Sequence, residues 1–449
     1  MNFLVDFPRW LLLALILYAP WAYGSIPSPW RDGLIFGCYG ILFLWITTLM
    51  VRRRINYLNL YGLFWVILIL AQGLWMVYNA KFIYDNDYNQ FTPFNPPYPT
   101  LPGSIDQVVS QFNILQLGSF LGIAMMACEI SQNPIWRNRI MLTLCLSGFS
   151  IIFLGLAQHL MGFLLLYPQR INVWPFATYY YHGNAGAYMN LVLPLIIGKL
   201  LLAFRNPERH IEHSLWICIA AISVAGPFIN ASKGATPITL LILFVWGIWQ
   251  IKRQLFHLSQ AKSLLTLISL GLILFVACSF LIYLIGPQVA IDRWTNALSS
   301  SGQFARGRLL TAEICLHMAP KAGAWGFGPD TFHIAFPFFT NEYGSKVFGF
   351  WRYAHMDYLQ TLVEWGWVGA ITWGMFFFGG IFRITWNYFK RYEHYSSKDR
   401  TLILSLLLAL LGMMIHMCYD FPFQIPSIQF YTLLMLGMAY GSSRWADAE

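Results

Sequence analysis

A polar and aromatic segment from Arg306 to Glu364 stands out in a sequence otherwise made of apolar runs. It begins with Arg306 and Arg308, which flank a glycine, and ends soon after His355, where the next apolar run starts. Arginines supply fixed positive charge for holding a diphosphate, and a histidine, which titrates near neutrality, can deprotonate a hydroxyl. A solvent-exposed loop between two membrane helices would carry the same residues for solubility alone. Taken by themselves, these residues favour neither explanation.

Further polar side chains lie at the ends of apolar runs that we assign to the same face. Lys233 lies in a short turn between two such runs, where most lysines only extend towards the membrane surface. His416 and Asp420 are four residues apart at the end of another run, a spacing that lets two side chains pair on one helix face, structurally or functionally. The ionisable residues gather near span ends rather than at mid-span, which favours chemistry or binding at one face over proton-coupled transport.

Motifs for nucleotide or metal chemistry are missing. The sequence contains no P-loop, no dinucleotide glycine fingerprint, no His-Glu-x-x-His and no Asp-x-Asp site. We therefore expect no cofactor and no metal, so an enzyme of this kind would need a substrate that carries its own leaving group. The 7 cysteines form no Cys-x-x-Cys pair, so neither a disulfide framework nor a zinc site is expected. Nothing resembles a nucleic-acid-binding module.

The composition is that of a membrane protein. Of the 449 residues, 57% are hydrophobic and only 10% are charged, far below the share of charged residues in soluble domains. The net charge of +9 would suggest nucleic acid in a soluble protein. Here the basic residues fall mostly in short loops between apolar runs, which is typical of membrane topology.

Apolar runs long enough to cross a bilayer recur along the whole chain and predict an all-α polytopic membrane protein with about twelve helices. The predicted spans are 10–28, 33–51, 58–79, 110–130, 139–162, 185–204, 213–230, 235–251, 263–285, 361–386, 401–418 and 427–442. We interpret residues 1–449 as a single membrane domain, with one long extracytoplasmic loop at about 286–360 before the tenth helix. We also expect the first span to remain uncleaved, because cleavage would leave an odd number of helices.

Orientation follows from lysine and arginine. With the N-terminus in the cytoplasm, clusters such as Arg52-Arg53-Arg54 and Lys390-Arg391 fall on the inside, and the loops predicted to be outside contain few basic residues. Both termini are then cytoplasmic and the segment around His355 is outside. A proline-rich segment, Asn79 to Ser110, is predicted to be an ordered, extended lip on the same side.

Several short motifs follow one another in a recognisable order. They are Tyr181 to Tyr188, Pro194-Leu195, Ser232 to Ala235, Gly307-Arg308, Trp325 to Gly328, Ala354 to Leu359, Glu364 to Gly366 and His416 to Ile425. Their order and spacing resemble the O-antigen ligase and polymerase superfamily of bacterial membrane glycosyltransferases, over roughly the C-terminal two thirds of the chain. Two departures are Lys233, where the family usually has arginine, and Met356, where a small polar residue is usual.

The resemblance implies a metal-independent glycosyltransferase in the bacterial inner membrane. Its donor would be a glycan linked to undecaprenyl diphosphate, and its acceptor a hydroxyl of a glycan, lipid or protein. In this family a histidine activates the acceptor and arginines hold the diphosphate as it leaves. We assign these roles to His355 and Arg308, with Lys233 as a second cation and Arg306 added by its proximity.

Supporting roles remain open among a further set of residues. Asp357 or Glu364 is expected to orient the His355 ring, and His182, His333 and His416 are competing candidates for the base. Asn184, His416 and Asp420 belong to motifs of the resemblance and are possible supporting residues.

The motifs do not distinguish a ligase from a polymerase of lipid-linked repeat units. A transporter of lipid-linked glycans is the alternative from a different functional class. The expected partners are the lipid-linked donor, the acceptor and membrane lipids, with no nucleic acid.

Overall fold

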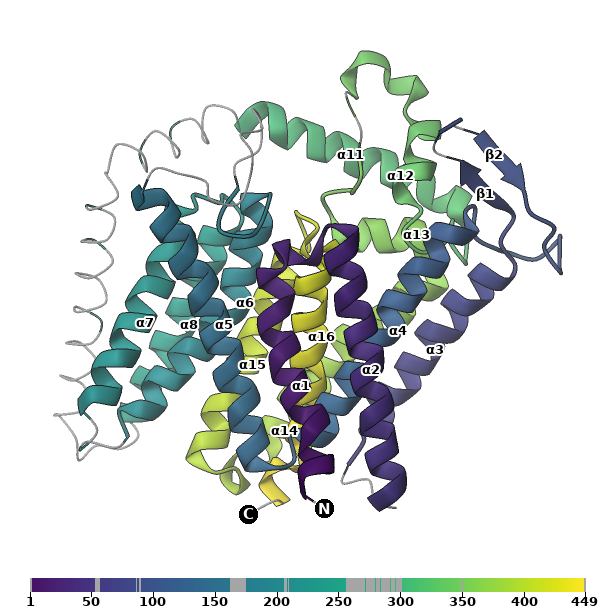
Figure 1. Ribbon diagram of the computed structural model, residues 1–449. Helices are drawn as coiled ribbons and strands as arrows, with labels where there is room; N and C mark the ends of the chain where they lie inside the picture. Colours follow the sequence, from purple (N-terminus) through teal and green to yellow (C-terminus); the bar gives the residue numbers. More distant parts are fainter. Residues whose placement is uncertain are drawn as a thin grey trace.

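The protein is a bundle of apolar helices, and the computed structural model places both chain termini at the same end of it (Figure 1). The structure describes residues 2–52, 57–85, 87–88, 90–161, 175–205, 208, 210–255, 301–347, 349 and 351–447, with single positions between 271 and 295. Within these ranges, 8 helices are long and apolar enough to cross a membrane. The predicted all-α polytopic architecture is therefore confirmed, whereas the predicted number of about twelve spans is not established.

The helices of the first half follow the apolar runs. In chain order they are α1 (Asn2–Trp21), α2 (Ser28–Arg52), α3 (Leu60–Tyr78), α4 (Gln107–Ile130), α5 (Pro134–Met161), α6 (His182–Ala203), α7 (His210–Ile229) and α8 (Ala235–Leu255). Capping residues fix two of the starts, because the Asn59 side chain accepts a hydrogen bond from the backbone N–H of Gly62 and Asp106 accepts one from Val109. The predicted span 263–285 lies outside the described residues except for single positions.

The first helix differs from its predicted range of 10–28. Helix α1 begins at Asn2 and ends at Trp21, and the 3₁₀ turn η1 (Tyr23–Ser25) separates it from α2. Tyr23, Gly24 and Ser25 all have positive φ angles, which reverses the chain before the apolar run ends. Apolar composition alone therefore overestimated how far this helix extends.

The second half contains longer interruptions. Its elements are α11 (Ser301–Ala322), α12 (Phe332–Ala335), η2 (Phe336–Phe339), η3 (Asn341–Lys346), α13 (Asp357–Gly374), the π-turn η4 (Met375–Gly379), α14 (Gly380–Lys390), η5 (Tyr392–His394), α15 (Ser397–His416), η6 (Pro422–Gln424), α16 (Pro426–Gly441) and η7 (Ser442–Asp447). Helices α13 and α14 run on through the π-turn as one 34-residue candidate span. Except for 263–285, each predicted span overlaps a described helix.

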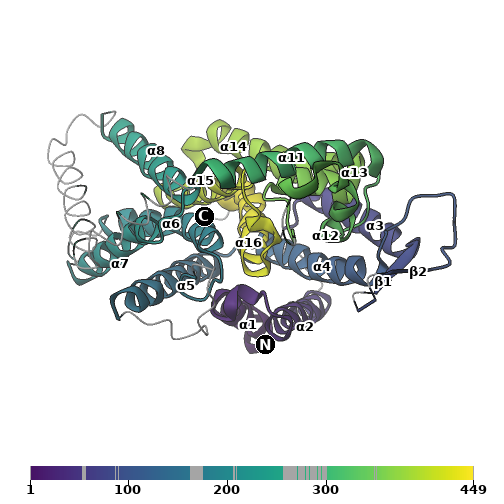
Figure 2. The same ribbon diagram turned by 90° about the horizontal axis from the view of Figure 1, so that it is seen from above.

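Helix α16 forms the centre of the bundle. Every residue from Pro426 to Gly441 is buried, which is typical of a helix that is apolar on all sides. It packs against α4, α15, α1 and α6, and it lies between the flanking helices in the view from above (Figure 2). A Cβ atom at Gly437 would lie 2.0 Å from the carbonyl oxygen of Ala124, so this glycine permits the close approach of α16 and α4.

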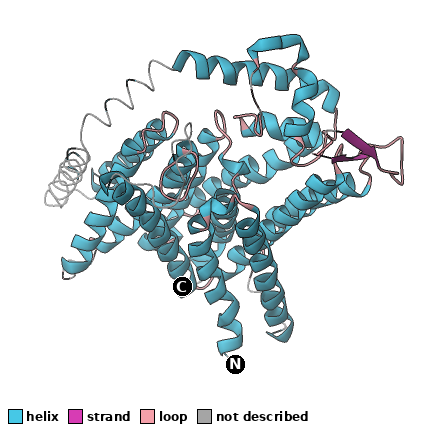
Figure 3. Ribbon diagram, turned by 45° about the horizontal axis from the view of Figure 1, so that its top comes forward, coloured by secondary structure: helices cyan, strands magenta, loops and turns pink. Residues whose placement is uncertain are grey.

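The end of the bundle opposite the termini carries the segment that contains the candidate site. Helix α11 lies across this end, and the antiparallel hairpin of β1 (Phe82–Asp85) and β2 (Gln90–Pro93) projects beside it (Figure 3). Part of the predicted extended lip thus forms a pair of antiparallel strands. The segment predicted as a long loop contains α11, a helix too polar to count among the candidate spans.

The outer segment is attached to α13 by a close backbone contact between two glycine-containing stretches, residues 326–328 and 363–366. The backbone N–H groups of Phe327 and Gly328 donate to the carbonyl oxygens of Val363 and Glu364, respectively. A Cβ atom at Gly326 would lie 2.2 Å from the carbonyl oxygen of Glu364, and both Gly326 and Gly366 have positive φ angles. The glycines of these two motifs are therefore required for close backbone contact, which fixes α11 relative to the start of α13.

Candidate active site

Three predicted polar residues meet at the outer end of the bundle. Asp420, from the loop between α15 and α16, lies with Oδ1 3.2 Å from Nδ1 of His355. Its other oxygen, Oδ2, is 3.7 Å from Nη2 of Arg308 on α11. The Asp420 side chain is 6% exposed, whereas those of His355 and Arg308 are 27% and 35% exposed. One buried carboxylate thus links a histidine and an arginine that both reach solvent.

The position of His355 is set by its backbone and by aromatic rings. Its φ angle of +54° is unusual for a residue other than glycine and turns the chain immediately before α13 begins. The ring packs edge-on against Phe421 and Trp351, with centroid distances of 4.6 Å and 5.7 Å. Within the described part of the chain, the hydrogen bond of Nδ1 is the only one of this ring. Nδ1–H donates to Asp420, which leaves the Nε2 lone pair available to accept a proton, as in other carboxylate–histidine pairs.

Asp420 is held in its ionised form. Burial acts to raise the pKa of this carboxyl, but the hydrogen bond from His355 and the positive charge of Arg308 outweigh it, so the pKa lies below its ordinary value. The first turn of α6 adds to this environment, because a Cβ atom at Gly183 would lie 2.8 Å from Oδ2 of Asp420. A helix N-terminus favours a nearby negative charge.

Arg308 is positioned by two neutral acceptors as well as by the carboxylate. Its Nη1 donates to the carbonyl oxygen of Tyr419 at 2.9 Å, and its Nη2 donates to the hydroxyl of Tyr181 at 3.0 Å. A guanidinium has five N–H donors, so donors remain for a phosphate at the exposed edge. The arrangement orders the cation without neutralising it by a close ion pair.

Lys233 lies on the turn between α7 and α8, next to the same group. Burial and the positive charge of Arg308 lower the pKa of its ammonium. The hydroxyl of Tyr419 donates to the carbonyl oxygen of Gly234 at 2.6 Å, which fixes this turn to the loop that carries Asp420. Lys233 itself is exposed, so the site has a second cation at its solvent side.

Two predicted supporting residues have other partners. Asp357 accepts hydrogen bonds from the backbone N–H of Phe423 and the side chain of Gln424, at 3.0 and 2.9 Å. Glu364 accepts from the backbone N–H of Phe332 and from Gln360. The expectation that one of these carboxylates orients the His355 ring is therefore wrong, because the ring bonds Asp420 and both carboxylates bond other groups.

The predicted pairing of His416 with Asp420 is also absent. His416 is buried, and neither of its ring nitrogens has a hydrogen-bond partner in the described structure. The Asp420 carboxylate lies beyond the end of α15 and faces His355 and Arg308 instead. Asn184 is likewise buried, in the first turn of α6, and its Oδ1 has no hydrogen-bond partner among the described residues.

A second polar cluster lies in the outer segment, around Arg352. Its Nη2 is 2.8 Å from Oδ2 of Asp330, and its Nη1 is 2.7 Å from Nε2 of His333. Burial and the charge of Arg352 lower the pKa of His333 to about 3, so this ring is neutral but faces a cation. His333 is therefore a poorer candidate for the base than His355.

Two contributions were missed by sequence reasoning. The hydroxyl of Tyr181 donates to Oδ2 of Asp420 at 3.4 Å and accepts a hydrogen bond from Nη2 of Arg308, so it bridges the carboxylate and the guanidinium. Phe421 stacks between the rings of Tyr181 and Tyr353, with centroid distances of 5.7 and 4.5 Å. Tyr181 and Phe421 each lie next to or within a quoted motif, so the motif boundaries were the available signal. The side chain of Arg306 is not described.

Metal ligands do not gather anywhere in the described ranges, where no group of 3 or more His, Cys, Asp or Glu side chains is placed to hold an ion. The polar groups that do gather are one base, one carboxylate and two cations. That combination can accept a proton and bind an anion side by side.

Comparison with known proteins identifies part of the chain. No curated protein matches it significantly. Residues 218–374 match the family described as O-Antigen ligase, a range that includes Lys233, Arg308 and His355. Residues 218–374 are therefore similar to the O-antigen ligase family, and the resemblance of the motifs to the O-antigen ligase and polymerase superfamily is confirmed.

Proposed function

We propose that the protein transfers a glycan from an undecaprenyl-diphosphate-linked donor to an acceptor hydroxyl at the outer end of the bundle. The family match supports ligase- or polymerase-type chemistry in general terms. The observation that carries the finer proposal is the shared carboxylate of Asp420, which contacts His355 with one oxygen and Arg308 with the other. A proton acceptor and an anion-binding cation are thereby fixed relative to each other.

In the proposed reaction, the acceptor oxygen attacks the anomeric carbon of the donor sugar. The new bond is the glycosidic C–O bond, and the bond that breaks joins the anomeric carbon to the diphosphate. Nε2 of His355 takes the proton of the acceptor hydroxyl, and undecaprenyl diphosphate leaves with the electron pair. General-base help of this kind typically contributes about 10²–10⁴-fold.

The cations have the complementary role. Negative charge on the leaving diphosphate increases as the bond to the sugar breaks. Arg308 and Lys233 lie on the exposed side of the site, where they would bind this charge more strongly in the transition state than in the ground state. Because the donor brings its own leaving group, the proposal requires neither a nucleotide nor a metal.

The proposed orientation puts both termini in the cytoplasm of a bacterium and the site in the periplasm or outside the cell. Arg52, Lys390 and Arg391 lie at helix ends on the side of the termini, in agreement with the positive-inside rule. The site would then face the leaflet to which lipid-linked donors are delivered.

A reconstituted assay tests the function. The purified protein is mixed with a lipid-linked oligosaccharide donor and one of two acceptors, either a second lipid-linked repeat or a lipid A core, and the products are analysed by mass spectrometry. A new glycosidic bond that is absent with His355→Asn supports the proposal. Extension of the lipid-linked repeat identifies a polymerase, and glycan on the core identifies a ligase. Movement of intact donor between leaflets without a new bond would instead identify a transporter and overturn the proposal.

A further inference from the structure

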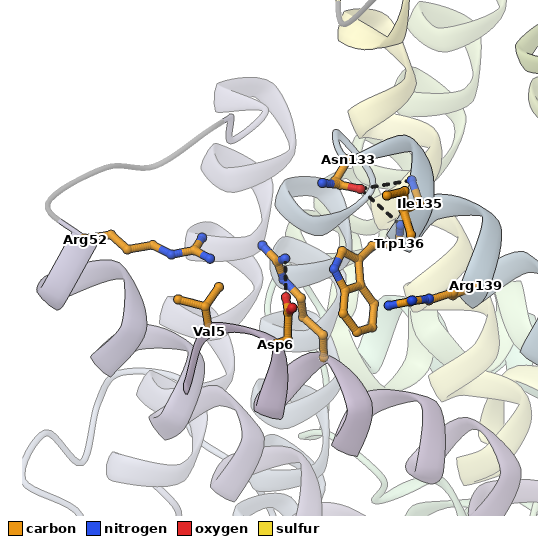
Figure 4. Close-up of a pocket in the computed structure, with 8 residues that line it drawn as sticks. Val5, Asp6, Arg52, Asn133, Ile135, Trp136 and Arg139 are labelled. Carbon is orange, nitrogen blue, oxygen red and sulfur yellow. Dashed lines mark hydrogen bonds and ion pairs between the residues drawn. The ribbon is translucent and has the colours of Figure 1, made fainter. Parts of the chain in front are cut away.

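A basic cavity lies at the end of the bundle that carries the termini, far from the site at the opposite end. It has a volume of about 330 Å³ and is lined by residues of three helices and a connection: Val5, Asp6, Arg9, Arg52, Asn133, Ile135, Trp136 and Arg139 (Figure 4). This volume is at the lower end of the range for ligand pockets. Nothing in the proposed glycan transfer uses these residues.

The cavity has an excess of positive charge. Of the three arginines, Arg9 is paired with Asp6 at 2.9 Å and is almost completely buried. Arg52, at the end of α2, and Arg139, in α5, form no ion pair among the described residues, although Asp6 and Glu129 act on Arg52 from farther away. Asp6 is the only carboxylate among the residues that line the cavity. The two side chains approach the cavity from opposite sides of Asp6 and Trp136 (Figure 4). Three arginines and one carboxylate line the cavity, and this excess of positive charge favours the binding of an anion.

The cavity is also built to hold its cations in place. The guanidinium carbon of Arg139 lies 4.6 Å from the centroid of the Trp136 ring and 4.8 Å from that of Trp10. Asn133 accepts hydrogen bonds from the backbone N–H groups of Ile135 and Trp136 through Oδ1, which fixes the start of α5 at the wall of the cavity. Cation–π stacking and the capped start of α5 hold the Arg139 guanidinium more firmly in place than solvent holds an exposed surface arginine.

The surroundings identify the kind of anion. Ile135 lines the cavity and is exposed, and Trp10, which stacks on Arg139, is half exposed. A Trp ring and apolar side chains beside arginines at the end of membrane-spanning helices are typical of the level of the lipid headgroups. A soluble phosphate would gain nothing from this apolar rim, whereas a phospholipid would place its acyl chains there.

We propose that this cavity binds the phosphate headgroup of an anionic phospholipid from the leaflet on the side of the termini, with Arg52 and Arg139 as the principal contacts. The site joins α1, α2 and α5, so a bound lipid holds these three helices together. The inference rests on the cavity alone and holds whether or not the protein transfers glycans.

Native mass spectrometry of the full-length protein in neutral detergent tests the inference. Phosphatidylglycerol and phosphatidylcholine are titrated separately into the wild type, into Arg52→Gln/Arg139→Gln, and into Lys390→Gln, a matched loss of one exposed cation at the same end but outside the cavity. Each basic residue that contacts the headgroup is expected to contribute about fivefold to the binding of anionic lipid. We therefore expect the double variant to bind phosphatidylglycerol about 25-fold more weakly. Phosphatidylcholine binding should be unchanged in all three proteins, and Lys390→Gln should behave like the wild type.

Other outcomes would overturn the inference. Equal affinity of the wild type for the two lipids would remove the charge selectivity, and an unchanged affinity of the double variant would place the lipid elsewhere. Displacement of the lipid by millimolar glycerol phosphate, which has the headgroup chemistry without acyl chains, would identify a soluble anion as the ligand. A single symmetric gel-filtration peak for the double variant shows that a weaker affinity is not caused by misfolding.

Discussion

Nδ1 of His355 lies 3.2 Å from Oδ1 of Asp420, although 65 residues separate the two in the chain. His355 precedes α13 and Asp420 follows α15, and the backbone N–H of Asp357 donates to the carbonyl oxygens of both Met417 and Asp420. The two loops are therefore joined by backbone as well as side-chain hydrogen bonds. This connection keeps the imidazole in one orientation with Nε2 directed away from the carboxylate.

Replacing His355 should abolish most transfer. His355→Asn removes the base, and asparagine tolerates the positive φ angle at this position better than most residues, so folding should be retained. We expect kcat to fall by about 10²–10⁴-fold with little change in donor binding. The control is His317→Ala, which removes an exposed histidine of the same outer segment that bonds Tyr343. Near wild-type turnover in His355→Asn, measured with purified lipid-linked donor, would exclude His355 as the base.

Replacing Arg308 should separate charge from geometry. Lysine keeps the positive charge, but one ammonium cannot reproduce the fork that reaches both the Tyr419 carbonyl and the Tyr181 hydroxyl. We expect Arg308→Lys to retain a fraction of the activity and Arg308→Ala to lose about 10²-fold or more in kcat/KM. The measurement is initial rate against donor concentration. Equal activity of the lysine and alanine variants would show that positive charge at this position has no role in donor binding.

The sequence predicted the helices better than the contacts between them. Most of the described helices follow apolar runs that the hydropathy pattern reveals, and the motifs singled out His355 and Arg308, which both lie at Asp420. The partner of His355 was not predictable in the same way. Asp357 was favoured by its nearness in sequence, but its carboxylate points to Phe423 and Gln424, and the true partner is brought in by the fold.

The basic cavity formed by three helices was also not predictable from the sequence. Arg52 and Arg139 each satisfied the positive-inside pattern, so nothing in the sequence set them apart from other basic residues at span ends. Only the packing of α1, α2 and α5 brings them to one cavity. Hydrophobic periodicity and local motifs predict the structure of one helix or loop at a time, whereas a site is formed by side chains from several helices and loops.

Adding a methyl group at Gly366 should destabilise the outer segment. Gly366 has φ +65° and ψ −171°, a region open almost only to glycine, and a Cβ atom there would lie 2.4 Å from the carbonyl oxygen of Ala324. We expect Gly366→Ala to lower the free energy of unfolding by about 1–3 kcal/mol or more. The matched control is Gly374→Ala in the same helix, where a Cβ atom meets nothing within 4 Å. A thermal midpoint for Gly366→Ala equal to that of the control would refute the close backbone contact between Gly366 and Ala324.

Replacing Asp420 should change both activity and the dependence of stability on pH. Asp420→Asn keeps the shape of the side chain but removes the charge that orients His355 and faces Arg308, so we expect kcat at neutral pH to fall by about 10²-fold or more. The pKa of Asp420 is lowered in the folded protein, because the hydrogen bond from His355 and the charge of Arg308 outweigh the effect of burial.

A lowered pKa in the folded state means that the ionised carboxylate stabilises the fold at pH values above the ordinary aspartate pKa of about 4, and that this contribution is lost as the pH falls through the folded pKa. The thermal midpoint of the wild type should therefore exceed that of Asp420→Asn at about pH 5, and the difference should shrink below about pH 4. Asp87→Asn, which changes an exposed carboxylate at the tip of the hairpin, should match the wild type throughout. A difference that grows as the pH falls from about 5 to 3 would mean that Asp420 takes up a proton in the folded protein, and the charged carboxylate proposed at this site would have to be abandoned.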